Sequence, residues 1–209
     1  MPFGDTVMVK EWLKIEGVVH KPACEHPKRV VEGLDCKRRE VSGMRFWTLF
    51  DRLCSSPEQF FKHCYVHNYC PLSFMEESGK NVTPPSMKRA VRSQLEAACD
   101  RALSETVLLF QPSIIVGVGQ YAETCARRAV KSAFTKVVDS EESEEATETS
   151  SSKQEGDCMG KEICVCSIPH PSPRNAKANK DWYSSATESL ERHGVLKFIA
   201  RTVTSSPAT

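Results

Sequence analysis

Apolar residues recur at helical spacing in several segments of the chain, each close to a residue that can cap a helix. Near the N-terminus, Val9, Trp12 and Leu13 fall on one side of a helix that Asp5 or Thr6 can cap. The same spacing predicts helices over about residues 5–15, 42–53, 86–109, 119–129 and 181–192. Ser56-Pro57 is a typical start for one more short helix.

Mostly apolar runs without helical spacing separate these segments. Ser113–Val118 and Ile163–Ile168 have the composition of strands that are buried on both faces of a parallel sheet. A third apolar stretch leads from Phe60 into His67-Asn68, and Pro71 ends it. Strands that alternate with helices predict an α/β fold, here a three-layer α/β/α sandwich around a short parallel sheet.

Two glycines, Gly117 and Gly119, mark the end of the first of these runs. A dinucleotide-binding fingerprint would need a third glycine and an acidic residue placed about 20 residues further on, and neither is in place. We therefore expect a tight turn from strand to helix, whose backbone amides can still meet a phosphate.

Composition adds limits on the class of protein. The chain has 209 residues, of which 40% are hydrophobic, enough for one domain with a core. No apolar run approaches the ~20 residues of a membrane span, so we expect no membrane contact. Ten scattered cysteines, none in a Cys-x-x-Cys pair, favour reduced thiols in a nuclear or cytosolic protein. His20, Cys24 and His26 lack a second pair at ligand spacing, so no metal is expected.

The net charge of +1 hides a strong division along the chain. Between Asp139 and Asp157 there are eight acidic residues and a single lysine, Lys153. This segment is rich in Ser, Thr and Glu and has no aromatic residue, so we expect a disordered insertion over residues 139–161. The remaining chain is basic, which suits nucleic acid because lysine and arginine displace the counterions of phosphates. The acidic segment either competes for that basic surface or only adds solubility.

The segment after the Ile163–Ile168 run carries the most distinctive chemistry. His170 stands at the exit of the predicted strand, between prolines at every second position from Pro169 to Pro173, and basic and amide residues follow. Ligands of open α/β sheets bind at the carboxyl ends of the strands. Prolines also stiffen the segment, so little entropy is lost when it meets a partner. The alternative is a proline-rich surface turn with solvated lysines.

A second polar group follows another predicted strand. Asn68 stands where the apolar stretch from Phe60 ends, and its amide offers donors and an acceptor in one plane, as the edge of a nucleobase does. An isolated asparagine at such a position is usually a turn former. Its occurrence together with the His170 loop favours a binding role.

These segments together resemble a monofunctional branch of the uracil-DNA glycosylase superfamily. The resemblance runs through most of the chain and is most specific in the loop His170-Pro-Ser-Pro-Arg-Asn175. It also includes Pro2-Phe3-Gly4, Glu25-His-Pro-Lys-Arg29, Glu40-Val-Ser-Gly43, Arg45-Phe-Trp47, His67-Asn68 with Cys70-Pro-Leu72, Gly117-Val-Gly119 and Ala178-Asn-Lys180.

The resemblance implies an enzyme that flips uracil or an oxidised uracil derivative out of single- or double-stranded DNA and hydrolyses its glycosidic bond with water. By resemblance, Phe3 would stack on the base, Asn68 would bind its N3–H and O4 edge, and His170 would donate to O2 as negative charge develops. Arg174 and the prolines would fill the vacated stack. The DNA-binding residues expected in this way are Pro173, Arg174, Asn175, Lys177, Asn179 and Lys180. No metal or organic cofactor is implied.

One departure bears on activity. In the family, a strand ending in Gly-Met-Asn-Pro-Gly precedes the Pro2-Phe3-Gly4 segment, and its Asn positions the attacking water. That string does not occur in this chain. We therefore expect an N-terminally shortened form without one interior strand of the sheet, with Phe3 loosely held at a free end. The alternative function is a catalytically deficient DNA-binding or interaction protein.

The expected organisation is a glycosylase-like domain made of residues 1–138 and 162–198. Residues 139–161 would form the acidic insertion, and residues 199–209 a flexible tail. The expected partner is DNA that contains uracil or oxidised pyrimidines, and the expected state is a monomer in the nucleus.

Overall fold

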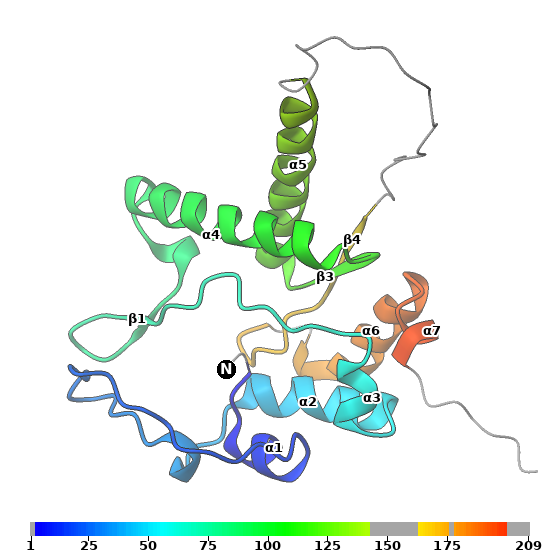
Figure 1. Cartoon of the computed structure of the whole chain (residues 1–209). Coiled ribbons are helices and arrows are strands. Elements are labelled where there is room, and N and C mark those ends of the chain that lie inside the picture. The colour runs from blue at the N-terminus through cyan, green and yellow to red at the C-terminus, as the bar shows by residue number, and fades with distance from the viewer. Residues whose placement is uncertain (1–2, 143–162, 176–177, 200–209) are drawn as a thin grey trace, which may run out of the picture. The chain divides into compact units, whose positions relative to one another are not determined.

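The computed structural model describes residues 3–142, 163–175 and 178–199 (Figure 1). In chain order the elements are α1 (Thr6–Glu11), the 3₁₀ turn η1 (Gly33–Asp35), α2 (Val41–Leu53), α3 (Pro57–Phe61), β1 (Phe74–Met75), β2 (Asn81–Val82), the 3₁₀ turn η2 (Pro84–Ser86), α4 (Arg89–Phe110), β3 (Ile114–Val118), α5 (Gln120–Glu142), β4 (Cys164–Ile168), α6 (Ala178–Arg192) and α7 (Leu196–Ile199). The chain divides into two compact units. Met1–Ser86 with Ile168–Thr209 form the first unit, and Met87–Ser167 form the second.

An aromatic core holds the first unit together. Phe46, Trp47 and Phe50 lie on the buried side of α2, where they contact one another and Phe60 of α3 with ring centroids 4.5–5.9 Å apart. Such ring pairs each add about 0.5–1.5 kcal/mol beyond the area they bury. The helix α2 packs against both α1 and α6, so it is the central support of this unit.

Two helices of the first unit begin at side chains that cap them. Asp5 caps α1 by accepting from the amide of Met8 at 3.2 Å. Ser56 caps α3 by accepting from Gln59, with Pro57 at the first helical position, as the sequence predicts. Helix α2, predicted from about residue 42, begins at Val41, and Glu40 before it makes no side-chain capping hydrogen bond. Helical spacing therefore locates the helices but not all of their ends: α1 ends at Glu11, before the predicted residue 15, and α5 continues to Glu142, far beyond the predicted residue 129.

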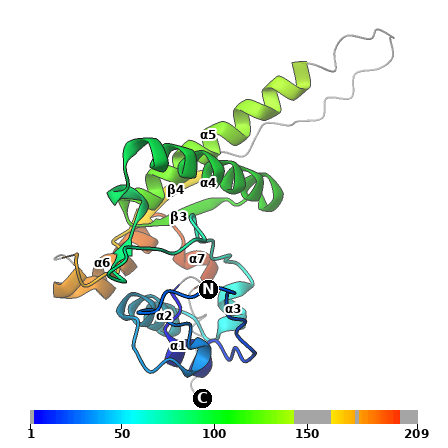
Figure 2. The ribbon, with the colours of Figure 1, turned by 90° about the vertical axis from the view of Figure 1, so that its left-hand side faces the viewer.

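The second unit consists of α4 and α5 beside the strands β3 and β4 (Figure 2). Among the described strands, β3 and β4 make a two-stranded parallel sheet, and α5 packs on both β3 and α4. Small buried side chains at every fourth position of α5 let the helices approach closely. These are Cys125, Ala129 and Ala133, and the buried apolar residues of α4 include Cys99, Leu103 and Val107.

Gly117 explains how β3 meets α5. A Cβ at this position would lie 2.4 Å from the backbone nitrogen of Glu123, so no larger residue fits there. Gly119 then adopts a positive φ of 90°, which turns the chain into the helix. This is the tight turn that the sequence predicts.

The α/β class is confirmed, but the third predicted strand is wrong. Residues 64–68 have no regular secondary structure, because a strand needs a neighbouring backbone to pair with and this stretch joins no ladder among the described residues. The segment Phe74–Met75 pairs instead with Asn81–Val82 in a short antiparallel hairpin.

The predicted boundaries of the insertion and the tail also need adjustment. Helix α5 continues to Glu142, so residues 139–142 are helical and do not belong to an irregular insertion. Ile199, assigned to the tail, is a fully buried residue at the end of α7. The rest of both segments lies outside the described residues. None of the described helices is long and apolar enough to cross a membrane.

Candidate active site

The His170 loop leaves β4 at Ile168 and is held in a defined shape by its own polar groups. The amide of Asn175 donates to the carbonyl oxygen of Ser172 at 3.0 Å, which closes a turn with Pro173 and Arg174 at its centre. The amide of Arg174 donates to the Ser172 hydroxyl at 3.2 Å. Proline suits the second position of such a turn because its φ is already fixed.

The imidazole of His170 has one nitrogen engaged with the backbone of its own loop. Its Nδ1 accepts from the amide of Ser172 at 3.1 Å, so Nδ1 carries no proton and, in the neutral ring, Nε2 is the donor. Desolvation by surrounding atoms lowers the pKa of His170 below its ordinary value of 6.5. The residue is nevertheless exposed to solvent. At neutral pH the loop therefore presents a neutral imidazole as a hydrogen-bond donor.

Side chains from outside the loop fix its backbone. Pro171 is fully buried, and its carbonyl oxygen accepts from Nη1 of Arg45 in α2 at 3.0 Å. At the start of the loop, the carbonyl oxygen of Pro169 accepts from the indole nitrogen of the buried Trp182 at 2.8 Å. The position of His170 is thus set from two helices of the first unit.

Asn179 belongs to the same network. Its Oδ1 accepts from Nη2 of Arg45 at 3.1 Å, and its Nδ2 donates to the carbonyl oxygen of Pro173 at 2.7 Å. Asn175 donates to the carbonyl oxygen of His170 at 3.2 Å. Both amides, expected from the sequence to meet DNA, make contacts within the protein here.

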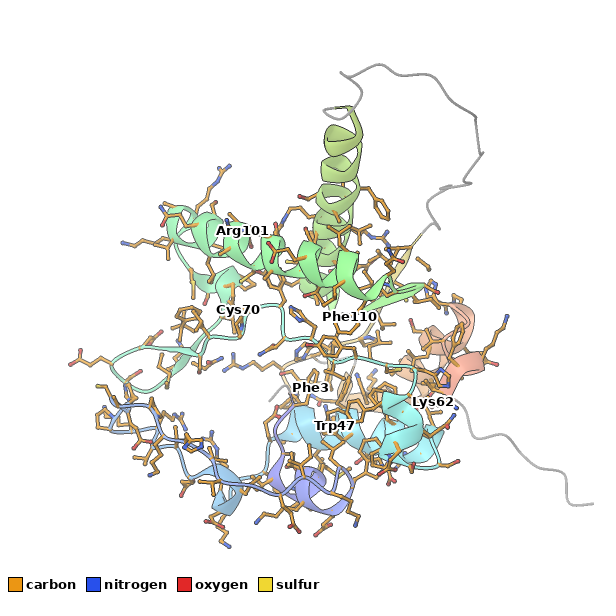
Figure 3. The ribbon with its side chains drawn as sticks, viewed as in Figure 1. Phe3, Trp47, Lys62, Cys70, Arg101 and Phe110 are labelled. Atoms are coloured by element: carbon orange, nitrogen blue, oxygen red, sulfur yellow. The ribbon has the colours of Figure 1, made fainter. Side chains whose placement is uncertain are left out.

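Phe3 is firmly held, contrary to the expectation of a loose end. Its ring stacks on Phe46 with the centroids 4.2 Å apart and the planes 13° apart. Its carbonyl oxygen accepts from the indole nitrogen of Trp47 at 2.8 Å and from the amide of Asp5 at 3.0 Å. Figure 3 labels Phe3 and Trp47, which lie together at α2.

Gly43 makes this arrangement possible. A Cβ there would lie 2.6 Å from the carbonyl oxygen of Phe3, so the glycine lets the Phe3 backbone lie directly on α2. Phe3 itself has a φ of 54°, the left-handed conformation, and its side chain is only partly buried. One face of its ring is covered by Phe46.

The structure does not bring Asn68, the predicted base-reading residue, into this network. It is exposed, in the irregular segment 64–68, and no hydrogen bond between described residues joins it to the His170 loop. Its neighbour His67 has a pKa lowered by desolvation.

Helix α2 supports both Phe3 and the His170 loop, through the adjacent residues Phe46 and Arg45.

The remaining residues predicted to contact DNA are exposed where the structure describes them. Pro173 and Arg174 are exposed, as is Lys180 at the start of α6. Lys177 lies outside the described residues. Within the described parts of the chain, no group of three or more His, Cys, Asp or Glu side chains could hold a metal ion.

Comparison with known proteins decides the family. The Uracil DNA glycosylase superfamily matches residues 3–191. The chain belongs to this superfamily. The match spans both compact units, including Phe3, Asn68, the His170 loop and nearly all of α6.

Three curated relatives carry the same name. The chain is 41% identical over 199 residues to "Single-strand selective monofunctional uracil DNA glycosylase" of Mus musculus, and equally so to the corresponding proteins of Bos taurus and Rattus norvegicus. The aligned region covers 95% of this chain and 62%, 64% and 62% of those proteins, respectively. The chain thus spans less than two thirds of the length of the relatives it matches. The similarity to this monofunctional branch confirms the resemblance seen in the sequence.

Sequence reasoning missed the residues that support the loop. Arg45 and Trp182 contact it across 126 and 13 positions of the chain, and neither contact follows from helical or strand spacing. The sequence does hold one chemical signal for these contacts. Prolines have no N–H to donate, but their carbonyl oxygens still accept hydrogen bonds, so Arg and Trp side chains are candidate donors to the loop.

Proposed function

We propose that this chain is the catalytic part of a monofunctional DNA glycosylase, which hydrolyses the glycosidic bond of uracil and oxidised uracil derivatives in single- and double-stranded DNA. The proposal is supported by the family, by the names of the relatives, and above all by the neutral Nε2 donor that the His170 loop presents. This enzyme would serve base-excision repair in the nucleus as a monomer, without a cofactor and without contact to a membrane.

The chemistry follows from what each side chain offers. The damaged nucleotide leaves the stack, and its base lies on the ring of Phe3, which Phe46 supports from behind. As the glycosidic bond breaks, negative charge builds on the base, and the Nε2–H of His170 stabilises it at O2. Deleting one such donor typically costs ~10²–10³ in rate. Water attacks the sugar, since a monofunctional enzyme forms no Schiff base.

Selection of the base would fall to Asn68. Its amide can donate to O4 and accept from N3–H of uracil, whereas cytosine reverses both groups and would leave them unpaired. An unpaired buried polar group costs ~1–3 kcal/mol. Because Asn68 is exposed, this role requires that the extruded base bury its amide.

The loop rim would meet the DNA itself. Arg174 is exposed at the centre of the turn and would occupy the space left by the extruded base, and Lys180 would lie against a phosphate. Phosphate contacts supply most of the affinity and carry no sequence information. Binding and chemistry therefore depend on different residues of the same unit.

The direct test is release of the free base. The natural full-length protein is incubated with single- and double-stranded oligonucleotides that carry one uracil, 5-hydroxymethyluracil, cytosine or thymine, and abasic sites are counted after alkaline cleavage. We expect cleavage at uracil and at the oxidised base and none at cytosine or thymine. Binding to all four without base release would support the catalytically deficient DNA-binding alternative and contradict the proposed activity.

A further inference from the structure

Arg45 of α2 hydrogen-bonds both the His170 loop and a residue of α6. Its Nη1 donates to the carbonyl oxygen of Pro171, and its Nη2 donates to Oδ1 of Asn179. Asn179 passes the contact on, because its Nδ2 donates to the carbonyl oxygen of Pro173. We call Arg45 and Asn179 the clamp. It fixes the backbone on both sides of Ser172, whose amide holds His170 Nδ1.

The chemistry of the loop explains why these two side chains are suited to it. Prolines have no N–H, so Pro169, Pro171 and Pro173 cannot be tied down through their own amides, and only their carbonyl oxygens can be bonded. A guanidinium presents several N–H donors in a fixed plane and can serve two acceptors at once. An asparagine amide accepts on one side and donates on the other, so it relays the contact without a break.

The helix that carries Arg45 is anchored in the aromatic core. Arg45 precedes Phe46 and Trp47, which are 4% and 1% exposed and lie in the aromatic core. Phe46 carries the ring of Phe3. The same turn of α2 therefore supports the proposed stacking surface and the loop that carries the proposed hydrogen-bond donor, which fixes their spacing.

We infer that Arg45, acting through Asn179, is a positioning residue that holds His170 in its catalytic orientation and makes no contact with the substrate base. This inference rests on the proposed function of His170. It also gives Asn179 a role within the protein in place of the phosphate contact that its sequence position suggests. A displacement of about 1 Å at a reacting group can cost ~10²-fold in rate, so loss of the clamp is expected to reduce the chemical step strongly.

The competing role for a partly exposed arginine is a phosphate contact. The two roles differ in which quantity they change. A phosphate contact contributes to DNA affinity and its salt dependence, whereas a positioning residue changes the rate of base release from DNA that is already bound.

The experiment measures both quantities in the natural full-length protein. Arg45→Gln is compared with Arg52→Gln, which removes the same charge from the same helix. Arg52 is a suitable control because, like Arg45, it contacts α6 from α2. It is exposed, and its guanidinium lies over the ring of Tyr183, 4.2 Å from the centroid. We expect single-turnover release of uracil to fall by about tenfold or more in Arg45→Gln, with Kd for uracil-containing DNA changed by less than about threefold. Arg52→Gln should change neither by more than about threefold.

Two further variants separate geometry from charge and from folding. Arg45→Lys keeps the charge but has no planar fork for two acceptors, so its rate should fall nearly as far as that of Arg45→Gln. Asn179→Ala should lower the rate in the same direction, and combining it with Arg45→Gln should add little, because both act on one network. Thermal unfolding of every variant shows whether the fold is retained.

The most decisive comparison uses a protein without the His170 imidazole, the group that the clamp is inferred to position. In a His170→Ala background, Arg45→Gln should cause no further loss of rate, because nothing is left for the clamp to orient. An equal loss with and without His170, or a loss of DNA affinity that matches the loss of rate, would overturn the inference. Absence of base release by the unsubstituted protein would instead contradict the proposed function, and the two failures are therefore distinguishable.

Discussion

Three residues, Phe3, Asn68 and His170, show how far residue chemistry alone can be followed. His170 could be singled out because it follows a strand, where ligands of α/β sheets bind, and the structure leaves its Nε2 as the donor of the neutral ring; its catalytic role stays a prediction. Phe3 could be named only by resemblance, and its firm support by Phe46 and Trp47 could not be predicted, since it depends on Gly43 leaving room. Arg45 was overlooked because its partners lie 126 and 134 positions away.

Asn68 offers the clearest prediction at this scale. In Asn68→Asp the carboxylate has no donor for uracil O4 and can accept from cytosine N4. We expect uracil release to fall about tenfold or more, in line with ~1–3 kcal/mol for an unpaired group, and discrimination against cytosine to weaken. The measurement is release of free uracil and free cytosine from matched oligonucleotides.

The control for this variant is Asn81→Asp, the same change at an exposed residue of β2 in the same unit. It should leave both rates unaltered. If Asn68→Asp excises uracil and rejects cytosine as well as the unsubstituted protein does, Asn68 does not recognise the base.

At the scale of elements, sequence predicted helices better than strands for a physical reason. A helix satisfies its backbone within one segment, so spacing and caps such as Ser56 suffice to locate it. A strand depends on a neighbour, which a single sequence does not reveal. The stretch 64–68 has the composition of a strand but is irregular, whereas Ile114–Val118 forms one beside Cys164–Ile168.

The junction of β3 with α5 gives a prediction about stability. Gly117→Ala places a Cβ 2.4 Å from the backbone nitrogen of Glu123 in α5. Because the clashing atom belongs to the backbone, no side-chain rotation can relieve the clash. We expect the free energy of unfolding to fall by ~1–3 kcal/mol, the usual cost of overpacking. Chemical denaturation followed by circular dichroism measures it.

Thr124→Ala is the control, since it alters α5, the helix that the Cβ of Gly117→Ala would meet, at a solvent-facing position. It should change the free energy of unfolding by less than about 0.5 kcal/mol. Equal stability of Gly117→Ala and the unsubstituted protein would show that β3 and α5 are not in close contact there.

For the whole molecule, the separation of charge along the chain predicts how DNA binding responds to salt. The acidic residues gather between Asp139 and Asp157, and the rest is basic. If the acidic segment competes with DNA, deleting residues 143–157, beyond α5, should tighten DNA binding at low salt. The difference should vanish at about 1 M salt, where the Debye length is ~3 Å. Fluorescence anisotropy over a salt series measures this; unchanged affinity at low salt would leave the segment a solubilising role only.

One pH series tests most directly whether the neutral imidazole of His170 stabilises the departing base. Single-turnover release of uracil is measured against pH for the unsubstituted protein and for His170→Ala, with DNA affinity measured at each pH. Desolvation holds the pKa of His170 below 6.5. The ring should therefore stay neutral as the pH falls to that value, and become protonated at Nδ1 only below it.

The unsubstituted protein should keep a constant rate from about pH 8 down to the lowered pKa of His170. The rate should then fall as protonation removes the acceptor for the Ser172 amide and turns the ring. His170→Ala should be slower by about tenfold or more at neutral pH, should lack this acid decline, and should bind DNA within about threefold of the original affinity. A His170→Ala protein that releases uracil at the original rate, or that keeps the same acid decline, would contradict the account.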